Sequence, residues 1–271
     1  MLSNPMIVVT FALPQESQDF RKALLNPKGF TGRMPVPLHQ GSRPSPARED
    51  GGLIGCLSNA RESADIRVLH TGVGLAAAEH AMGKLLVVER PHVVISSGFA
   101  GALDPKLRVA DLVVATNFSS PELAGVCREI GVSPSLLHFG GISSQTAAIE
   151  SVSEKAALGR TSGALAVDME TSAIAATCQA TGVPFLSVRA ISDSAHERLP
   201  VPFDVWFDLK KQRPRALNLV CHLAAHPGTI GPFIRFVRGL TPARLALTGF
   251  LIDLLNSETF AARLKQIRSL K

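Results

Sequence analysis

The chain has 271 residues, of which 46% are hydrophobic and 18% are charged, and its mean hydropathy is +0.21. This apolar content is enough for a large core, so composition excludes a mainly disordered chain. The four cysteines are widely spaced and form no CxxC pair, which argues against a cysteine-rich zinc site and favours a reducing, cytoplasmic location. The N-terminal residues do not resemble a signal peptide, and no long uncharged apolar stretch predicts a membrane span.

Charge is distributed unevenly along the chain. Residues 209–271 hold 11 Lys/Arg against only Asp253 and Glu258, a net charge of +9. Residues 1–208 hold 17 Lys/Arg against 20 Asp/Glu, a net charge of −3. A basic tail on a nearly neutral body indicates an anionic partner for the tail, while a solvated helical surface explains the charge equally well.

Short apolar runs alternate with helical segments over residues 6–196. The run MIVVTF at residues 6–11 predicts a buried first strand, and the stretch 27–52, rich in Pro, Gly, Ser and Arg, predicts a loop or weak hairpin. Further strands are expected at residues 66–70, 93–96, 109–115, 136–139, 164–167 and 185–190, and helices at 75–88 and 169–180. This alternation predicts an α/β fold of three layers, α/β/α, with a mixed, largely parallel central sheet.

Beyond Pro200 the pattern becomes helical. Apolar residues recur at i, i+3, i+4 and i+7 over 233–240 and again over 247–255, so two or three amphipathic helices are expected. We therefore predict a catalytic domain over residues 1–208 and a basic, amphipathic helical extension over 209–271 that packs on it.

Acidic residues stand where strands are expected to end. Glu16 follows the first strand, Asp168 and Glu170 follow a later one, and Asp193 follows the last. Each alone could be a helix cap or a partner of a helix dipole. Because ligands bind at the carboxyl ends of parallel strands, we expect these carboxylates to converge on one site, where one can act as acid and another as base.

The segment Gly72–Ala77 matches GxGxxA between a strand and a helix. This pattern is only a weak indication of a dinucleotide site. In such sites an acidic residue at the end of the next strand binds the ribose, and here that strand ends in serines. The same glycines can bring backbone N–H groups close to a sugar or an anion. The histidines have no metal-ligand spacing, so no metal site is expected.

Three groups of motifs together resemble the nucleoside phosphorylase/nucleosidase superfamily. They are TGVG at 71–74, ISSGFAGALDP at 95–105 followed by VADLVV at 109–114, and VDME at 167–170 with VRAISD at 188–193. Their order and spacing agree with the superfamily over roughly residues 6–196. The resemblance implies a phosphorylase-like fold, a small-molecule nucleoside substrate, no cofactor, no metal, no nucleic-acid partner, and a homo-oligomer, commonly a dimer.

Within the superfamily, the pattern is most similar to methylthioadenosine/S-adenosylhomocysteine nucleosidases. Their first strand is followed by a small residue and, four positions on, a catalytic glutamate, and Ala12 and Glu16 have that spacing. Phosphorylases of the superfamily carry a Gly-Asp-Pro phosphate loop with an arginine near this point, and this sequence has none, which favours water as nucleophile. The tail, with His226-Pro227-Gly228, resembles the hopanoid-associated branch, which is thought to act on adenosylhopane, a lipid nucleoside.

The resemblance implies a division of roles among the site residues. Asp193 is expected to be the general acid on the leaving base, and Glu16 to activate the attacking water. Glu170 is expected to hold the ribose hydroxyls, with Met169 against the sugar face. The other expected substrate contacts are Asp168, Thr71, Gly72, Ser97, Gly98 and Ile149.

The sequence departs from the family pattern at several points. Ala148 stands near the position of the family's adenine-stacking phenylalanine, Asp168 replaces a glutamate, and Phe99 replaces a small residue. Three alternatives therefore remain open. They are a purine nucleoside phosphorylase of the same fold, a non-catalytic nucleoside-binding module at a membrane surface, and, for 209–271, either peripheral membrane contact or an oligomer contact.

Overall fold

The computed structural model describes residues 4–25, 53–59, 62–130 and 136–269. In this part of the chain a nine-stranded sheet has the order β2-β3-β1-β4-β9-β5-β6, and β8 joins β4 and β7. The strands are β1 (Met6–Phe11), β2 (Leu53–Asn59), β3 (Glu62–His70), β4 (Val93–Ala102), β5 (Leu112–Ala115), β6 (Leu137–Gly140), β7 (Ile142–Ser144), β8 (Ala166–Asp168) and β9 (Phe185–Asp193), and β10 (Phe207–Asp208) pairs with β11 (Arg213–Pro214). Five of the pairs are parallel and three, β2 with β3, β4 with β8 and β5 with β9, are antiparallel, so the predicted mixed sheet is confirmed.

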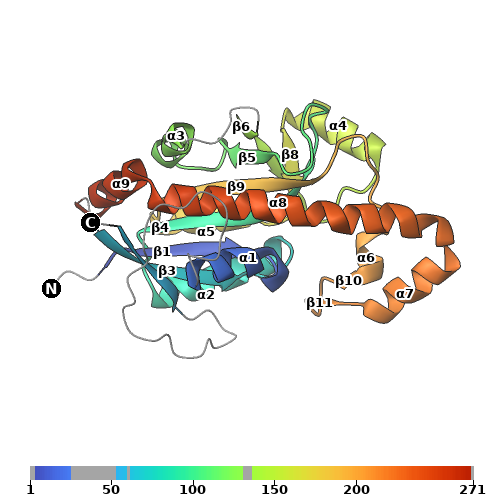
Figure 1. Ribbon diagram of the computed structural model, residues 1–271, viewed down its shortest axis with the longest axis horizontal. Helices are drawn as coiled ribbons and strands as arrows, with labels where there is room; N and C mark the ends of the chain where they lie inside the picture. The colour runs from blue at the N-terminus through green and yellow to red at the C-terminus, as the bar shows by residue number, and fades with distance from the viewer. Residues whose placement is uncertain (1–3, 26–52, 60–61, 131–135, 270–271) are drawn as a thin grey trace.

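Helices cover both faces of the sheet (Figure 1). Alternate residues of the central strands point to opposite faces, so Val8 and Val94 pack under α2 and α5, whereas Val9 and Ile95 pack under α1 and α8. This arrangement is the predicted three-layer α/β/α architecture. The helices are α1 (Pro14–Leu25), α2 (Leu75–Val88), α3 (Pro121–Glu129), α4 (Val152–Ser162), α5 (Thr171–Thr181), α6 (Phe203–Trp206), α7 (Ala216–Ala225), α8 (Ile230–Asn256) and α9 (Glu258–Ser269).

Several predicted boundaries need correction. The strand expected at 109–115 begins only at Leu112, because Ala110 has a φ of +76°, which is incompatible with a strand. The last strand continues to Asp193 instead of ending at Ala190. The two apolar patterns at 233–240 and 247–255 belong to one helix, α8, which runs on through Pro242. The antiparallel strand β2 was not predicted, and the loop or hairpin expected at 27–52 lies outside the described residues.

The two halves of α8 have different surroundings. Eight residues between 243 and 255 are buried, and this half packs on α1 and β9. The Arg244 guanidinium also lies 2.5 Å from the Asp19 carboxylate of α1. The half before Pro242 projects past the end of the sheet and turns back through α7 (Figure 1). None of the described helices combines the length and apolarity needed to cross a bilayer. The domain boundary at residue 208 remains our proposal.

Candidate active site at the ends of β4, β8 and β9

Two glycines of β4 allow the close approach of carboxylates from distant parts of the chain. Gly98 has a φ of +152°, and a Cβ there would lie 3.3 Å from Oε2 of Glu16. A Cβ on Gly101 would lie 3.1 Å from Oδ2 of Asp193. Three residues of a strand span about 10 Å, so Glu16 and Asp193 both lie against one short segment in the second half of β4. Their convergence on one substrate stays a prediction.

Glu16 is positioned by the turn between β1 and α1. Its Oε2 accepts hydrogen bonds from the backbone N–H groups of Ala12, at 2.9 Å, and Leu13, at 3.3 Å. Burial raises the pKa of the Glu16 carboxyl, and these hydrogen bonds and the nearby Arg189 charge only partly oppose that effect. A carboxyl with a raised pKa is suited to exchanging protons near neutral pH.

Asp193 is fixed by a buried lysine and by its neighbour in the strand. The Lys155 ammonium lies 2.5 Å from Oδ2, and the Ser192 hydroxyl donates to Oδ1 at 2.6 Å. An irregularity in the pairing of β4 with β9 sets Asp193, rather than Ser192, opposite Gly101. Bulges of this kind re-aim side chains beside active sites.

Lys155 is a site residue that the sequence analysis missed. It is completely buried in the first turn of α4, where the positive end of the helix dipole disfavours a cation. Its ammonium is nevertheless satisfied, because besides Asp193 it donates to the carbonyls of Ser194 and Glu197 at 2.8 and 2.7 Å. The capping box of Ser151 and Glu154 predicts that a helix begins here. A lysine directly after the capping box is unfavourable beside the helix dipole, and this was the sequence feature that could have drawn attention to Lys155.

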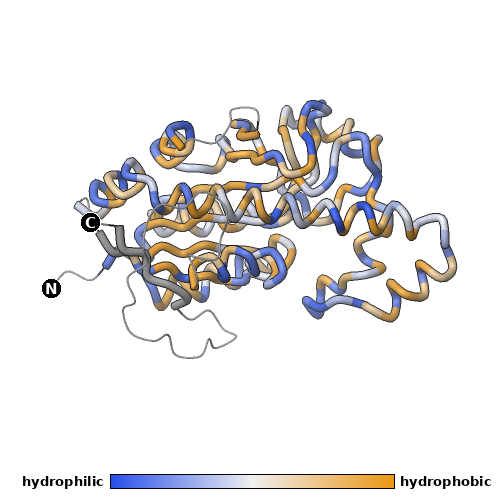
Figure 2. Tube along the Cα trace, in the orientation of Figure 1, coloured by the Kyte–Doolittle hydropathy of each residue, from blue (hydrophilic) through white to orange (hydrophobic). Residues whose placement is uncertain are grey.

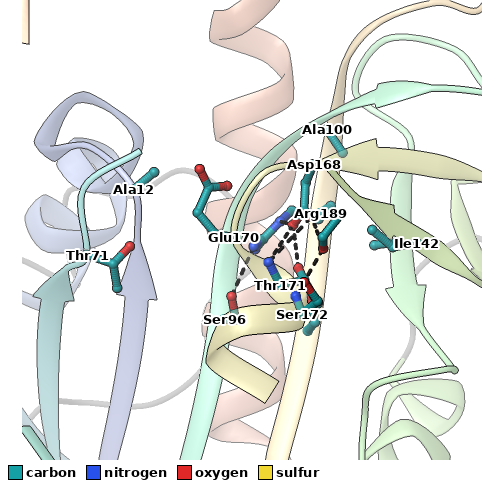
Figure 3. A network of polar contacts seen from close by, with 12 residues as sticks. Ala12, Thr71, Ser96, Ala100, Ile142, Asp168, Glu170, Thr171, Ser172 and Arg189 are labelled. Carbon is teal, nitrogen blue, oxygen red and sulfur yellow. Dashed lines mark hydrogen bonds and ion pairs between the residues drawn. The ribbon is translucent and has the colours of Figure 1, made fainter. Parts of the chain in front are cut away.

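A second buried ion pair lies beneath the site (Figure 3). Nε of Arg189 donates to Asp168 at 2.8 Å, and Nη2 donates to the Ser96 hydroxyl at 3.0 Å. Asp168 also accepts from the hydroxyls of Ser144 and Thr171. Its carboxylate is therefore engaged within the protein and positions its neighbours, and direct contact between Asp168 and a substrate stays an untested prediction.

Glu170 lies between this network and Thr71 (Figure 3). Its Oε1 accepts from the backbone N–H of Gly74 at 2.8 Å, and only 8% of the residue is exposed. Burial, followed by the negative charge of Asp168, raises the pKa of the Glu170 carboxyl to about 8. Glu170 is thus an acid that is kept from solvent and has one oxygen anchored.

The raised pKa of Glu170 predicts an effect on stability. A carboxyl whose pKa is higher in the folded protein stabilises the fold at low pH, and that stabilisation is lost as pH rises from about 4.5 through about 8. Glu170→Gln cannot ionise, so at pH 9 it should be more stable than wild type by on the order of 5 kcal/mol, and nearly equal to it at pH 4.5. Urea unfolding at both pH values measures this, with the exposed Glu122→Gln as the control that should change neither. The same pH dependence in wild type and Glu170→Gln would contradict it.

The remaining predicted contacts fall into two groups. Thr71 and Gly72 directly follow β3, whereas Ser97 and Gly98 lie in the middle of β4, with Gly98 against Glu16. Ser97 is buried, and its hydroxyl has no hydrogen-bond partner in the described part of the chain. This hydroxyl is therefore open to a hydrogen bond with a ligand. Ile149 packs instead against Leu103, Ala164 and Val167, and its contact with a substrate also stays an untested prediction.

An aromatic cluster beside Met169 was not predicted. The rings of Phe203 and Trp206 are 4.7 Å apart and those of Phe203 and Phe207 are 5.6 Å apart. This cluster packs against Met169 and Val73, and Ala148 joins it. Three aromatic residues within five positions, in a chain with only 14 Phe and Trp residues, were the signal that could have revealed it.

One surface groove lies away from the candidate site. It is about 500 Å³ in volume, lies between α3 and α9, and is lined by Pro121, Glu122, Gly125, Val126, Glu129, Thr259, Ala262, Arg263 and Gln266. None of the predicted site residues lines it. We therefore place the candidate site at the strand ends, where the acidic residues meet.

Comparisons with known proteins point to one family. The model of the Phosphorylase superfamily matches residues 62–138 and 120–225. A 5′-methylthioadenosine/S-adenosylhomocysteine nucleosidase of Exiguobacterium sp. (strain ATCC BAA-1283 / AT1b) is 30% identical over 171 residues, which is 52% of this chain and 72% of that protein. One from Glaesserella parasuis serovar 5 (strain SH0165) is 29% identical over 184 residues, 57% of this chain and 79% of that protein. The fold is similar to that of futalosine hydrolase of Helicobacter pylori strain 26695, with a TM-score of 0.60, 19% identity, and coverage of 93% of this chain and 97% of that one.

Proposed function

This chain belongs to the phosphorylase superfamily and is a nucleosidase, an enzyme that hydrolyses the N-ribosyl bond of a purine nucleoside, and we propose that its substrate is a 5′-substituted adenosine from which it releases adenine. The observation that carries this proposal is that Glu16 and Asp193, from separate segments, lie against Gly98 and Gly101 of β4, while the charge of Glu16 also acts on Glu170. The unpartnered Ser97 hydroxyl, in the middle of β4, supports it.

In the proposed mechanism each carboxyl acts at a different point of the nucleoside. Cleavage of the C1′–N9 bond leaves positive charge on the ribose and negative charge on the purine, as in glycoside hydrolysis. Asp193 carries a proton in the nucleoside complex and donates it to N7 of the leaving base, and Lys155 then stabilises the carboxylate that results. Glu16 accepts a proton from the attacking water. Glu170 binds the ribose hydroxyls through the oxygen that Gly74 does not hold, and Met169 packs against the sugar.

The aromatic cluster suggests the nature of the 5′ substituent. Met169 packs against Phe207 and the partly buried Phe203, Trp206 and Leu209, so an apolar surface adjoins the proposed sugar position. An apolar 5′ group gains by leaving water there. Methylthioadenosine and a lipid nucleoside of the adenosylhopane kind present such a group, and adenosylhomocysteine presents one only in the thioether and methylene part of its substituent.

The decisive experiment compares four nucleosides with and without phosphate. The purified protein is incubated with methylthioadenosine, adenosylhomocysteine, adenosine and inosine, and the free base is followed by chromatography. We expect adenine release without phosphate, with methylthioadenosine cleaved about 10–200-fold faster than adenosine, because one small apolar group contributes about 1–3 kcal/mol. Strict dependence on phosphate, with ribose 1-phosphate as product, would replace the nucleosidase proposal by the phosphorylase alternative.

A further inference from the structure

The projecting helical arm exposes many apolar side chains. We define the arm as residues 209–245, which include β11, α7 and α8 as far as Leu245. Eleven large apolar residues are highly exposed in the described part of the chain, and six of them lie in the arm: Leu217, Val220, Ile230, Ile234, Val237 and Leu245. Exposure reaches 74% for Leu217 and 62% for Val220. Figure 2 shows these hydrophobic stretches along α7 and the adjoining end of α8.

The arm is also strongly basic. Residues 209–245 include seven Lys/Arg and no Asp or Glu. Arg215 pairs with Asp208 and Arg244 with Asp19. The other five, which are exposed and form no ion pair with a described residue, are Lys210, Lys211, Arg213, Arg235 and Arg238. The arm therefore presents uncompensated positive charge.

Apolar and basic side chains are arranged side by side on the helices. Ile230, Ile234 and Val237 follow i, i+4 and i+7, so they form one stripe along α8. Arg235 and Arg238 each stand one position after a member of this stripe, about 100° around the helix. On α7, Leu217 and Val220 are three residues apart and share a face.

We propose that the arm docks on the surface of an anionic lipid bilayer. An interfacial helix buries its apolar stripe among the acyl chains near the headgroups while flanking Lys and Arg reach the phosphates. Charge decides between the possible occupants, because five uncompensated cations repel the same surface of a second copy, whereas anionic headgroups attract them. This inference goes beyond the proposed enzymatic function and does not depend on it.

Vesicle flotation at low salt tests the proposal on the full-length protein. We expect binding to vesicles of phosphatidylcholine with about 30–40% phosphatidylglycerol. Binding to vesicles of phosphatidylcholine alone should be much weaker. Arg235→Gln with Arg238→Gln should reduce the partition coefficient about 30-fold, since each basic residue near the surface contributes about 1 kcal/mol. Leu217→Ser with Val220→Ser should also release the protein.

Matched control variants distinguish the arm from general surface effects. Val87 and Val88, on α2, are 87% and 80% exposed, so Val87→Ser with Val88→Ser removes equally exposed apolar groups outside the arm. Lys84→Gln with Arg90→Gln removes two exposed charges from the same region. Both controls should bind like wild type, and thermal unfolding should confirm that every variant is folded.

Three outcomes would overturn the proposal. They are no flotation of the wild type with anionic vesicles, equal losses in the arm and control variants, and unchanged flotation of Leu217→Ser with Val220→Ser. If that last variant also changes the oligomeric state in sedimentation equilibrium, the surface is an interface between copies of the chain instead.

Discussion

Replacing Asp193 by asparagine should lower kcat for adenine release by about 10²–10⁴-fold, the usual contribution of a positioned proton donor. Asparagine has nearly the same shape and can still accept the hydrogen bond from Ser192, but it cannot transfer a proton to the purine. Steady-state kinetics with methylthioadenosine measures the loss. With a riboside whose leaving group departs without protonation, such as nitrophenyl riboside, the same substitution should lower kcat much less.

The control for this experiment is Asp253→Asn, which changes a half-buried carboxyl of α8. It should keep wild-type activity. If Asp193→Asn remains within about fivefold of wild type, or loses equally with both kinds of leaving group, then Asp193 is not the general acid.

Replacing Lys155 by methionine should destabilise the protein by about 3–5 kcal/mol, because removal of one member of a buried ion pair leaves the other charge unpaired. Here the unpaired group would be the Asp193 carboxylate, together with the carbonyls of Ser194 and Glu197. The free energy of unfolding in urea measures the change. In the double variant Lys155→Met with Asp193→Asn, most of the lost stability should return, because no buried charge remains.

Two observations would contradict this second prediction. One is a loss below about 1 kcal/mol in Lys155→Met, and the other is additive destabilisation in the double variant. The exposed lysine of α2 gives a matched control, since Lys84→Met should change stability by no more than about 0.5 kcal/mol.

The parts of the site that the sequence predicted are those encoded locally. Glu16 lies in the first turn of α1 after β1, Glu170 lies two residues after β8, and Asp193 is the last residue of β9. A sheet with parallel strands brings such ends to one edge. The first strand was correct to the residue, because MIVVTF is a continuous β-branched and aromatic run with clear ends.

The parts that were missed depend on contacts between distant segments. Lys155 meets Asp193 only because α4 packs beside the end of β9, and no local pattern encodes that packing. Phe203 and Trp206, in the short α6, and Phe207, in β10, reach Met169 from a distant part of the chain. The long α8 was predicted as separate helices from two apolar patterns. In the structure it runs on through Pro242, because packing of its buried half outweighs the local cost of a proline inside a helix.

The packing of α8 has a practical consequence for trimming the protein. Its second half packs on both α1, which carries Glu16, and β9, which carries Asp193. Arg244 also forms an ion pair with Asp19 of α1. Deleting everything after residue 208 would remove the helix that covers the two elements carrying Glu16 and Asp193, the carboxyls that we propose to be catalytic. A shortened enzyme that lacks only residues 209–242 must therefore keep residues 243–256 and rejoin them by a linker. Loss of turnover in a longer truncation would reveal nothing about what the arm binds.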